Sequence, residues 1–300
     1  MNAGSAPRLR AGGRDLDLGV PLLMGIVNAT PDSFSEVGGR RSLEALVSHA
    51  RDLASDGASI IDVGGESGVT HLPPVPIEDE MERVVPLVAR IVEELGIPVS
   101  VDTYKPAVAR AAVAAGACMV NDVSGLRDLG IADVCACTGA ALVIMHTRTA
   151  PKTERRDPDL YGDAGVVADV AAFLHERMEL ARARGVGKDQ IVLDPGPDFA
   201  KTPAQTVAVL HGLGSVSALG RPVLLALSRK DFIGAALGRA PGGRGAGTLA
   251  ALAWGADAGG HLFRVHDVAA AADFLKVRAL LRGELELSPD TALAPDLRRV

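Results

Sequence analysis

The chain has little cysteine, and it lacks the segments that direct a protein to a membrane or out of the cell. Its three cysteines, Cys118, Cys135 and Cys137, do not have the paired spacing of a zinc ribbon and are too few for a disulfide scaffold. Residues 1–14 contain no continuous apolar stretch of the kind found in signal peptides, and no segment approaches about 18 consecutive apolar residues. We expect a soluble protein of the reducing cytoplasm with no membrane partner.

An excess of positive charge is also missing. The formal net charge of the 300 residues is −6, and acidic and basic residues are interspersed, so no basic stripe is available for a nucleic-acid backbone. No Ser/Pro-rich linker or change of composition interrupts residues 20–285, which favours one large domain over two small ones. We expect small molecules, and no nucleic acid, as partners.

Eight short apolar runs are present, and each stops at or just before a polar residue. Runs of this length, rich in Val, Ile and Leu, are typical of buried parallel strands, and helical patterns fill the gaps between them. The runs are Leu22–Val27 before Asn28, Ser59–Val63 before Glu66, Pro98–Val101 before Asp102, Cys118–Val120 before Asn121, Ala141–Met145 before His146, Ile191–Leu193 before Asp194, Val223–Leu227 before Ser228, and Leu262–Val265 before His266.

Eight such βα units predict an α/β protein with the (β/α)₈ TIM-barrel architecture, whose site lies at the carboxyl ends of the strands. Residues 8–19 predict a hairpin that turns at Gly12-Gly13 and closes the bottom of the barrel. The predicted organisation is an N-terminal hairpin or extension over 1–19, the barrel over 20–285 and a tail over 286–300. An open doubly wound sheet is the alternative, but no strand is followed by G-x-G-x-x-G.

The short polar residues at three strand ends suit one kind of ligand. Asp102, Asn121 and Asp194 supply acceptors for a ring with a row of N–H donors, such as an aminopyrimidinone. Each alone is as consistent with a helix or turn cap, because Asp and Asn are usual capping residues. Convergence of all three with Lys230 and other charged groups favours a binding site.

Basic side chains, an imidazole and an amide at other strand ends suggest a site for an anion. Arg264 and His266 are one residue apart, so they face the same side of a strand, and with Asn28 and Lys230 they predict an anion-binding rim. His146 lacks an HExxH context, so a ligand or base and a structural or pocket-wall role stay equally open. The strand ends show no evident Ser-His or Cys-His pair for activating a nucleophile.

Several ordered motifs resemble those of dihydropteroate synthase, over about residues 22–282. The segments that carry the resemblance are Met24–Phe34, Asp62–Ser67, Val101–Thr103, Asn121–Gly125, Leu193–Gly196, Ser228–Lys230 and Arg264–Asp267. The resemblance implies condensation of 6-hydroxymethyl-7,8-dihydropterin diphosphate with p-aminobenzoate, which forms 7,8-dihydropteroate for folate synthesis and releases diphosphate. It also implies Mg²⁺, a homodimer formed through the outer helices, and a dissociative mechanism.

The site residues that the resemblance implies fall into three groups, and Lys230, Asp102 and Asp194 are also implied as the catalytic groups. The pterin would be held by Asp102, Asn121, Met145, Asp194 and Lys230; the diphosphate by Asn28, Arg264 and His266, with Asn28 as the metal ligand; and p-aminobenzoate by Phe34, Phe199 and Ser228.

The chain departs from the family pattern in two places near this site. After Glu66-Ser67 the family usually continues Thr-Arg-Pro, whereas this chain reads Gly68-Val69-Thr70-His71-Leu72-Pro73, and His71 or Arg148 are candidates to replace the missing cation. Asp198 stands where the family usually has Gly. Three hypotheses remain open: an active synthase, a diverged pterin-binding paralogue with weak or no turnover, and a pterin-dependent methyltransferase acting with a corrinoid partner.

Overall fold

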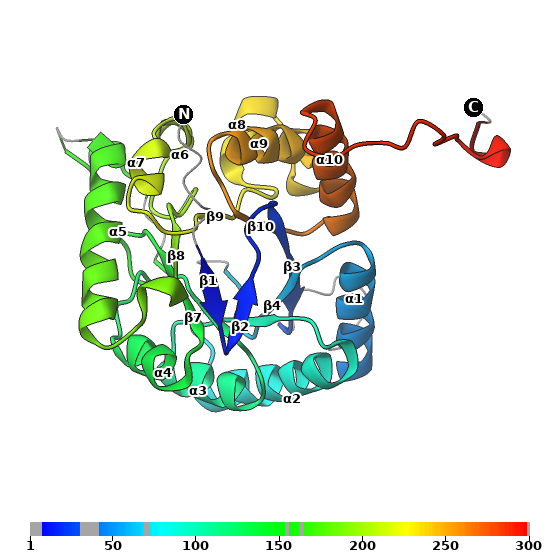
Figure 1. Cartoon of the computed structure of the whole chain (residues 1–300). Helices are drawn as coiled ribbons and strands as arrows, with labels where there is room; N and C mark the ends of the chain where they lie inside the picture. Colours follow the sequence, from blue (N-terminus) through cyan, green and yellow to red (C-terminus); the bar gives the residue numbers. More distant parts are fainter. Residues whose placement is uncertain (1–7, 31–41, 69–71, 154–155, 163–164, 299–300) are drawn as a thin grey trace.

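Eight parallel strands form a barrel in the computed structural model, which describes residues 8–30, 42–68, 72–153, 156–162 and 165–298 (Figure 1). In sequence order the barrel strands are β3 (Leu22–Asn28), β4 (Ile60–Gly64), β5 (Val99–Asp102), β6 (Met119–Asp122), β7 (Ala141–Met145), β8 (Ile191–Asp194), β9 (Leu224–Leu225) and β10 (Leu262–Val265). Their spatial order is β8-β7-β6-β5-β4-β3-β10-β9. A parallel bridge between Leu193 and Val223 joins the two ends, so the predicted TIM barrel is confirmed and the open sheet is excluded.

Helices follow the strands and cover the outside of the barrel. They are α1 (Leu43–Ser55), α2 (Ile77–Leu95), α3 (Pro106–Ala114), α4 (Gly130–Thr138), α5 (Gly165–Ala183), α6 (Pro203–His211), α7 (Gly214–Ser217), α8 (Asp231–Leu237), α9 (Gly245–Asp257) and α10 (Val268–Leu281). Local sequence sets several starts: the Ser42 and Asp267 side chains cap α1 and α10, and Thr202 forms a capping box with Gln205 at α6.

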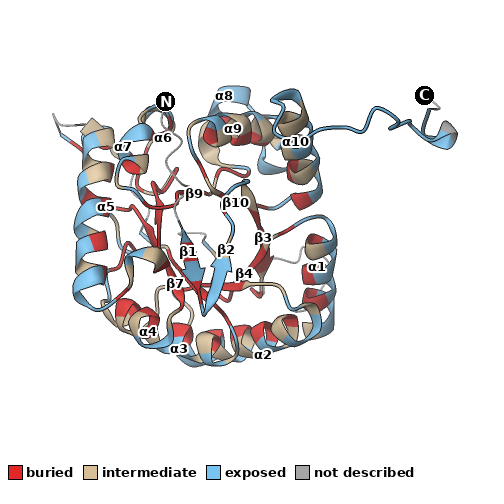
Figure 2. Cartoon of the chain, in the orientation of Figure 1, coloured by how far each residue is buried: buried red, intermediate tan, exposed pale blue. Residues whose placement is uncertain are grey.

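Side chains between the strands and the helices form the main core. Figure 2 shows buried residues along the strands and on the inward sides of the helices, with exposed residues on the outward sides. Val63, Val101 and Leu142 from the strands pack in one cluster with helix residues such as Leu87 and Leu174. This packing leaves the strand ends as the place where polar groups gather.

A second apolar cluster closes the bottom of the barrel. The hairpin of β1 (Leu9–Ala11) and β2 (Arg14–Leu16) turns through Gly12 and Gly13, both of which have positive φ. Leu9 and Leu18 pack there against the inward-facing Met24, Ile60 and Met119. Because this end is filled, a ligand has access from the opposite end.

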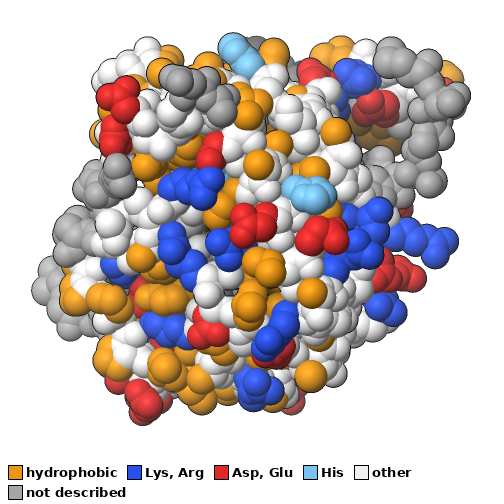
Figure 3. All heavy atoms as spheres, turned by 90° about the vertical axis from the view of Figure 1, so that its left-hand side faces the viewer, with side chains coloured by type: hydrophobic (Ala, Val, Ile, Leu, Met, Phe, Trp, Pro, Cys, Tyr) orange, Lys and Arg blue, Asp and Glu red, His pale blue; other side chains and the backbone are white. Residues whose placement is uncertain are grey.

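The outer surface carries mixed charge, and the C-terminal segment lies away from the barrel. On the face shown in Figure 3, basic and acidic side chains lie interspersed. Residues 284–294 are exposed and extend away from the barrel after α10. Within the described ranges, no helix combines the length and apolar character needed to cross a bilayer. The proposed division at residues 19 and 285 stays a prediction.

Candidate active site

A cavity of about 660 Å³ opens at the carboxyl ends of the barrel strands. Its wall brings together residues from the carboxyl ends of all eight barrel strands and the loops that follow them, as the barrel prediction requires. Nine of the predicted site residues line it: Asn28, Asp102, Asn121, Met145, Asp194, Phe199, Lys230, Arg264 and His266. Phe34 lies outside the described residues, and Ser228 is buried just behind the wall.

Arg264 is held between two carboxylates at the base of the cavity. Its Nε donates to Asp62 Oδ2 at 2.6 Å and its Nη2 donates to Asp102 Oδ2 at 2.8 Å. Asn121 Nδ2 also donates to Asp62 Oδ2, at 3.3 Å. Two of the five N–H donors of Arg264 thus serve carboxylates, and its predicted contact with the diphosphate stays a prediction. Asp62, on a strand that is otherwise apolar, is a site residue that the sequence reasoning missed.

Burial changes the protonation of the strand-end carboxylates. Burial raises the pKa of Asp102 to about 7, with the attraction of Arg264 opposing the shift and the repulsion of Asp62 adding to it. Burial also raises the pKa of Asp194 to about 6, although Asp194 Oδ1 accepts from the Gly196 N–H at 2.7 Å. Both groups can therefore exchange protons near neutral pH while facing a ligand.

Lys230 lies against an aromatic ring in the cavity wall. Its Nζ is 4.4 Å from the centroid of the Phe199 ring, within the range of a cation–π contact. Burial lowers the pKa of Lys230, and the carboxylates of Asp198 and Asp194 oppose that shift. The pair joins the loop after β8 to the start of α8, so a flat ligand ring would meet an aromatic face and an ammonium group together.

His266 and Ser228 form a hydrogen-bonded pair, which corrects the expectation that the site has no Ser-His contact. Ser228 Oγ lies 3.0 Å from His266 Nδ1 and accepts from the His266 backbone N–H at 3.3 Å. Ser228 Oγ is directed at the His266 ring and orients it, and the predicted contact of Ser228 with p-aminobenzoate stays a prediction. Desolvation in the cavity mouth, then Arg264, lower the pKa of His266, so the rim has a neutral imidazole at neutral pH.

An ion-pair cluster holds the two ends of the altered loop after β4. Lys105 Nζ contacts Glu66 Oε2 at 2.7 Å, Glu80 Oε2 at 2.5 Å and the Val75 carbonyl at 2.6 Å. The Tyr104 hydroxyl donates to Glu66 Oε1 at 2.9 Å. Burial alone would raise the pKa of Glu66, but these donors lower it. The loop is thus anchored at both sides of residues 69–71, which lie outside the described ranges and include His71.

Arg148 does not serve as the replacement cation in this structure. Its guanidinium pairs with Asp169 on α5, and it is absent from the residues that line the cavity. His146 is fully buried, and its Nε2 contacts the same Asp169 at 2.9 Å. Of the two roles left open for His146, the structure supports the structural one.

Asp198 connects the loop after β8 to helices α6 and α8. Its Oδ2 accepts from the Asp231 N–H at 2.5 Å, at the start of α8, and its Oδ1 accepts from Thr206 Oγ1 at 3.0 Å. Its backbone has a φ of 64°, a conformation in which Gly would be unstrained. The carboxylate that departs from the family pattern is therefore used within the protein, on the wall beside Lys230.

Three comparisons identify relatives of the chain. A family model described as "Pterin binding enzyme" matches residues 24–266. The dihydropteroate synthase of Bacillus subtilis is 45% identical over 248 residues, covering 82% of this chain and 84% of that protein. The Escherichia coli K12 dihydropteroate synthase is 38% identical over 270 residues, covering 90% and 95%.

Solved structures agree with these sequence matches. Xanthomonas albilineans dihydropteroate synthase with 4-aminobenzoic acid has a TM-score of 0.85 and 44% identity, and the match covers 93% of this chain and 99% of that one. The same enzyme in complex with 7,8-dihydropteroate gives a TM-score of 0.82 at 44% identity, with coverage of 92% and 99%. The chain belongs to the dihydropteroate synthase family of pterin-binding transferases.

Proposed function

We propose that the cavity binds 6-hydroxymethyl-7,8-dihydropterin diphosphate and p-aminobenzoate side by side and joins them, releasing diphosphate and forming 7,8-dihydropteroate for folate synthesis. The observation that carries the proposal is the common cavity, in which buried acceptors lie at its base and Lys230 stacks on Phe199 in its wall. The structures of Xanthomonas albilineans dihydropteroate synthase with 4-aminobenzoic acid and with 7,8-dihydropteroate support this choice of substrates.

The pterin subsite consists of the buried polar groups at the base of the cavity. Asp102, Asn121 and Asp194 offer acceptor oxygens to the N–H groups of the pterin, and Asn121 adds an amide donor. Arg264 fixes the Asp102 carboxylate, so the acceptor is positioned before the ligand arrives. Met145 supplies an apolar surface for the flat ring.

The diphosphate lies toward the rim, near Asn28, Lys230 and His266. A hydrogen bond from the neutral His266 ring and the charge of Lys230 stabilise the anion as its bond to the pterin methylene breaks. Arg264 also lines the cavity, and we assign its remaining N–H donors to the diphosphate while its Nη2 holds Asp102. Phe199 contacts the p-aminobenzoate ring from the loop after β8, and Ser228 acts on this region through His266.

The residues near Asn28 fit a magnesium ion. A Cβ on Gly64 would lie 3.5 Å from Asn28 Oδ1, so the glycine leaves room beside this hard oxygen donor. In the part of the chain that the structure describes, no group of three or more His, Cys, Asp or Glu could form a protein-only metal site. Such a site suits Mg²⁺ carried largely by the diphosphate, where it would neutralise charge on the leaving oxygens.

The reaction needs no protein nucleophile. The electron-rich pterin delocalises the positive charge that develops as the diphosphate departs, and the aniline nitrogen of p-aminobenzoate attacks the methylene carbon. The carboxylates of Asp102 and Asp194 hold the ring and stabilise that charge, while Lys230 remains on the side of the leaving anion. Orientation and electrostatics therefore supply the rate enhancement.

We further propose that the protein is a homodimer in the cytoplasm. Trp254, Val277 and Leu281 on the outer helices α9 and α10 are 48%, 54% and 84% exposed, which is apolar surface suited to a second copy. The cysteines are free, in keeping with a reducing compartment. Light scattering of the purified chain would show about twice the monomer mass, and a monomer mass that persists at high concentration would refute the dimer.

The activity is tested by incubating the purified full chain with Mg²⁺ and the pterin diphosphate, with and without p-aminobenzoate. We expect diphosphate release that requires p-aminobenzoate, with dihydropteroate identified by mass spectrometry. Tight pterin binding without release would instead identify a binding protein. Methyl transfer from a methylated pterin to a corrinoid protein, without diphosphate release, would identify the methyltransferase alternative.

A further inference from the structure

Lys201 is a charged side chain in the interior of the protein that the mechanism above does not use. It follows the loop after β8 and is 1% exposed, the largest of the fully buried side chains in the described residues. A lysine is rarely buried to this extent unless its ammonium group is paired. Lys201 does not line the cavity, so its function must act through other residues.

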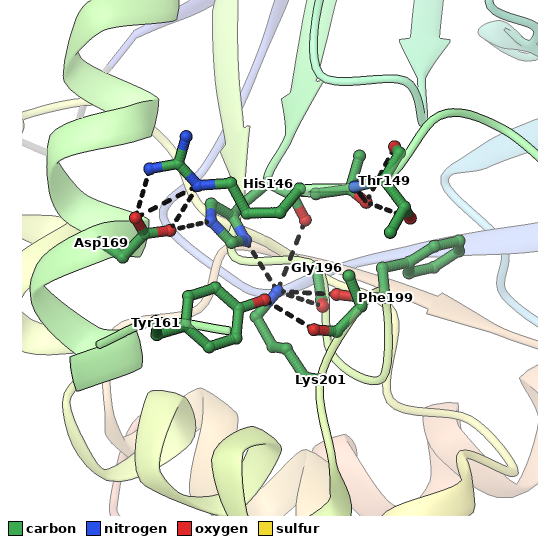
Figure 4. A network of polar contacts seen from close by, with 10 residues as sticks. His146, Thr149, Tyr161, Asp169, Gly196, Phe199 and Lys201 are labelled. Carbon is green, nitrogen blue, oxygen red and sulfur yellow. Dashed lines mark hydrogen bonds and ion pairs between the residues drawn. The ribbon is translucent and has the colours of Figure 1, made fainter. Parts of the chain in front are cut away.

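The donors of Lys201 are directed at one loop and one ring (Figure 4). Nζ lies 2.7 Å from His146 Nδ1, and it donates to the carbonyls of Gly196 at 2.9 Å and Phe199 at 3.1 Å. With Nδ1 as an acceptor, the His146 ring carries its proton on Nε2, which faces Asp169 Oδ2 at 2.9 Å. A continuous chain of contacts thus runs from α5, through the end of β7, to the loop after β8.

This loop requires such support because its backbone is unusual. Gly196, Asp198 and Ala200 all have positive φ, at 64°, 64° and 51°, and the last two carry side chains that disfavour this region. The loop also lies very close to β7, since a Cβ on Gly196 would be 2.1 Å from the His146 carbonyl oxygen. Tyr161 adds one more restraint, because its hydroxyl donates to the Ala200 carbonyl at 2.7 Å.

Phe199 connects this buried network to the cavity. Its carbonyl oxygen accepts from Lys201, while its ring stacks against Lys230 in the cavity wall. Its backbone is therefore held from the interior, and its ring faces the region of the site assigned to p-aminobenzoate. A change at Lys201 would be transmitted to Phe199 first and to the pterin subsite at the base only weakly.

We propose that Lys201, oriented by His146 and Asp169, is a positioning residue for the p-aminobenzoate subsite, where it holds the 195–200 loop so that Phe199 lies against Lys230. The proposal rests on the proposed function, since it assigns Phe199 to that substrate. It predicts that loss of Lys201 weakens the binding of p-aminobenzoate much more than the binding of the pterin diphosphate. General destabilisation of the protein would not produce this difference.

The test compares the full chain with three variants. Lys201→Met keeps the length of the side chain and removes the donors; Asp169→Asn weakens the far end of the network; Lys188→Met removes an exposed lysine as a matched control. For Lys201→Met we expect the KM for p-aminobenzoate to rise about tenfold or more, as expected for loss of hydrogen bonds from a charged group. The Kd of the pterin diphosphate, measured without p-aminobenzoate, should stay within about twofold of the wild-type value.

Asp169→Asn should change the KM for p-aminobenzoate in the same direction by a smaller factor, and it tests the network if Lys201→Met does not fold. Hydrogen exchange of residues 196–200 gives a readout without turnover: we expect faster exchange in both network variants and no change in Lys188→Met. An inactive wild type with faster loop exchange in the variants would refute the proposed function while leaving the loop restraint supported. Unchanged exchange, or an equal loss of affinity for both substrates, would overturn the role of Lys201.

Discussion

The contacts of Asp198 and its backbone conformation predict losses of stability of different size for two small substitutions at this position. Asp198→Ala and Asp198→Gly both remove the contacts to the Asp231 N–H and to Thr206 Oγ1. Asp198 is half-buried, so we assign this loss the lower end of the range for hydrogen bonds to a charged group, about 1.5 kcal/mol. The φ of 64° then separates the variants, because Gly adopts it freely and Ala does not.

Because Gly has no Cβ, it avoids the strain of the left-handed backbone, which stabilises the folded Asp198→Gly variant by about 1 kcal/mol relative to a residue with a side chain. We therefore expect a decrease in the free energy of unfolding of about 1.5–2 kcal/mol for Asp198→Ala and about 0.5–1 kcal/mol for Asp198→Gly. Guanidinium chloride unfolding, with an unchanged m-value, measures both. Equal stability of the two variants would refute the backbone argument, and a Gly variant more stable than the wild type would show that the carboxylate contacts contribute less than the relief of backbone strain.

Four further outcomes are expected from the site. Lys230→Ala should lower kcat by about 10²–10³ with an unchanged circular dichroism spectrum, and unaltered kinetics would remove Lys230 from the reaction. Asp194→Asn should weaken calorimetric binding of a pterin diphosphate analogue more than it raises the KM for p-aminobenzoate; equal effects would contradict the assignment. The pKa of Asp102 is raised to about 7 from its usual value of about 3.9, so its stabilising contribution is complete below about pH 4 and is lost as the pH rises through 7. The unfolding midpoint should therefore fall less between pH 5 and pH 8 in Asp102→Asn than in the wild type, and parallel pH profiles would argue against the shift. Gly68→Thr, Val69→Arg and Thr70→Pro together should raise kcat/KM about tenfold to a hundredfold, whereas a large loss in His71→Ala with no gain from the restored loop would show that His71 already supplies the contact.

The fold could be predicted because strand hydrophobicity and barrel geometry repeat along the chain. The apolar run Leu22–Val27 and strand β3 differ by one residue at the carboxyl end. The run Val223–Leu227 predicts its strand less well, since only Leu224 and Leu225 form β9. Val223 still makes a bridge to Leu193, and Leu227 is buried without ladder pairing, so burial extends beyond the regular strand.

The partners of the charged groups could not be predicted from the same pattern. Arg264 meets Asp62 across 202 residues of sequence, and Lys201 meets His146 across 55, so both pairs depend on the closed barrel. A charged residue within the apolar run that contains Asp62 was a usable signal of a buried ion pair. Nothing comparable marks Lys201, which follows a loop and whose burial depends on the path of that loop.

The pairing of Arg264 also explains why the altered loop matters. Two carboxylates, Asp62 and Asp102, already surround that guanidinium, and His266 is neutral at neutral pH, so neither adds much free positive charge for a departing diphosphate. Lys230 then carries more of the electrostatic stabilisation on the protein side. An arginine added to the loop after β4 would supply one more charge-assisted contact in the transition state. An arginine introduced into the sequence Gly68-Val69-Thr70 should therefore have a large effect on kcat/KM.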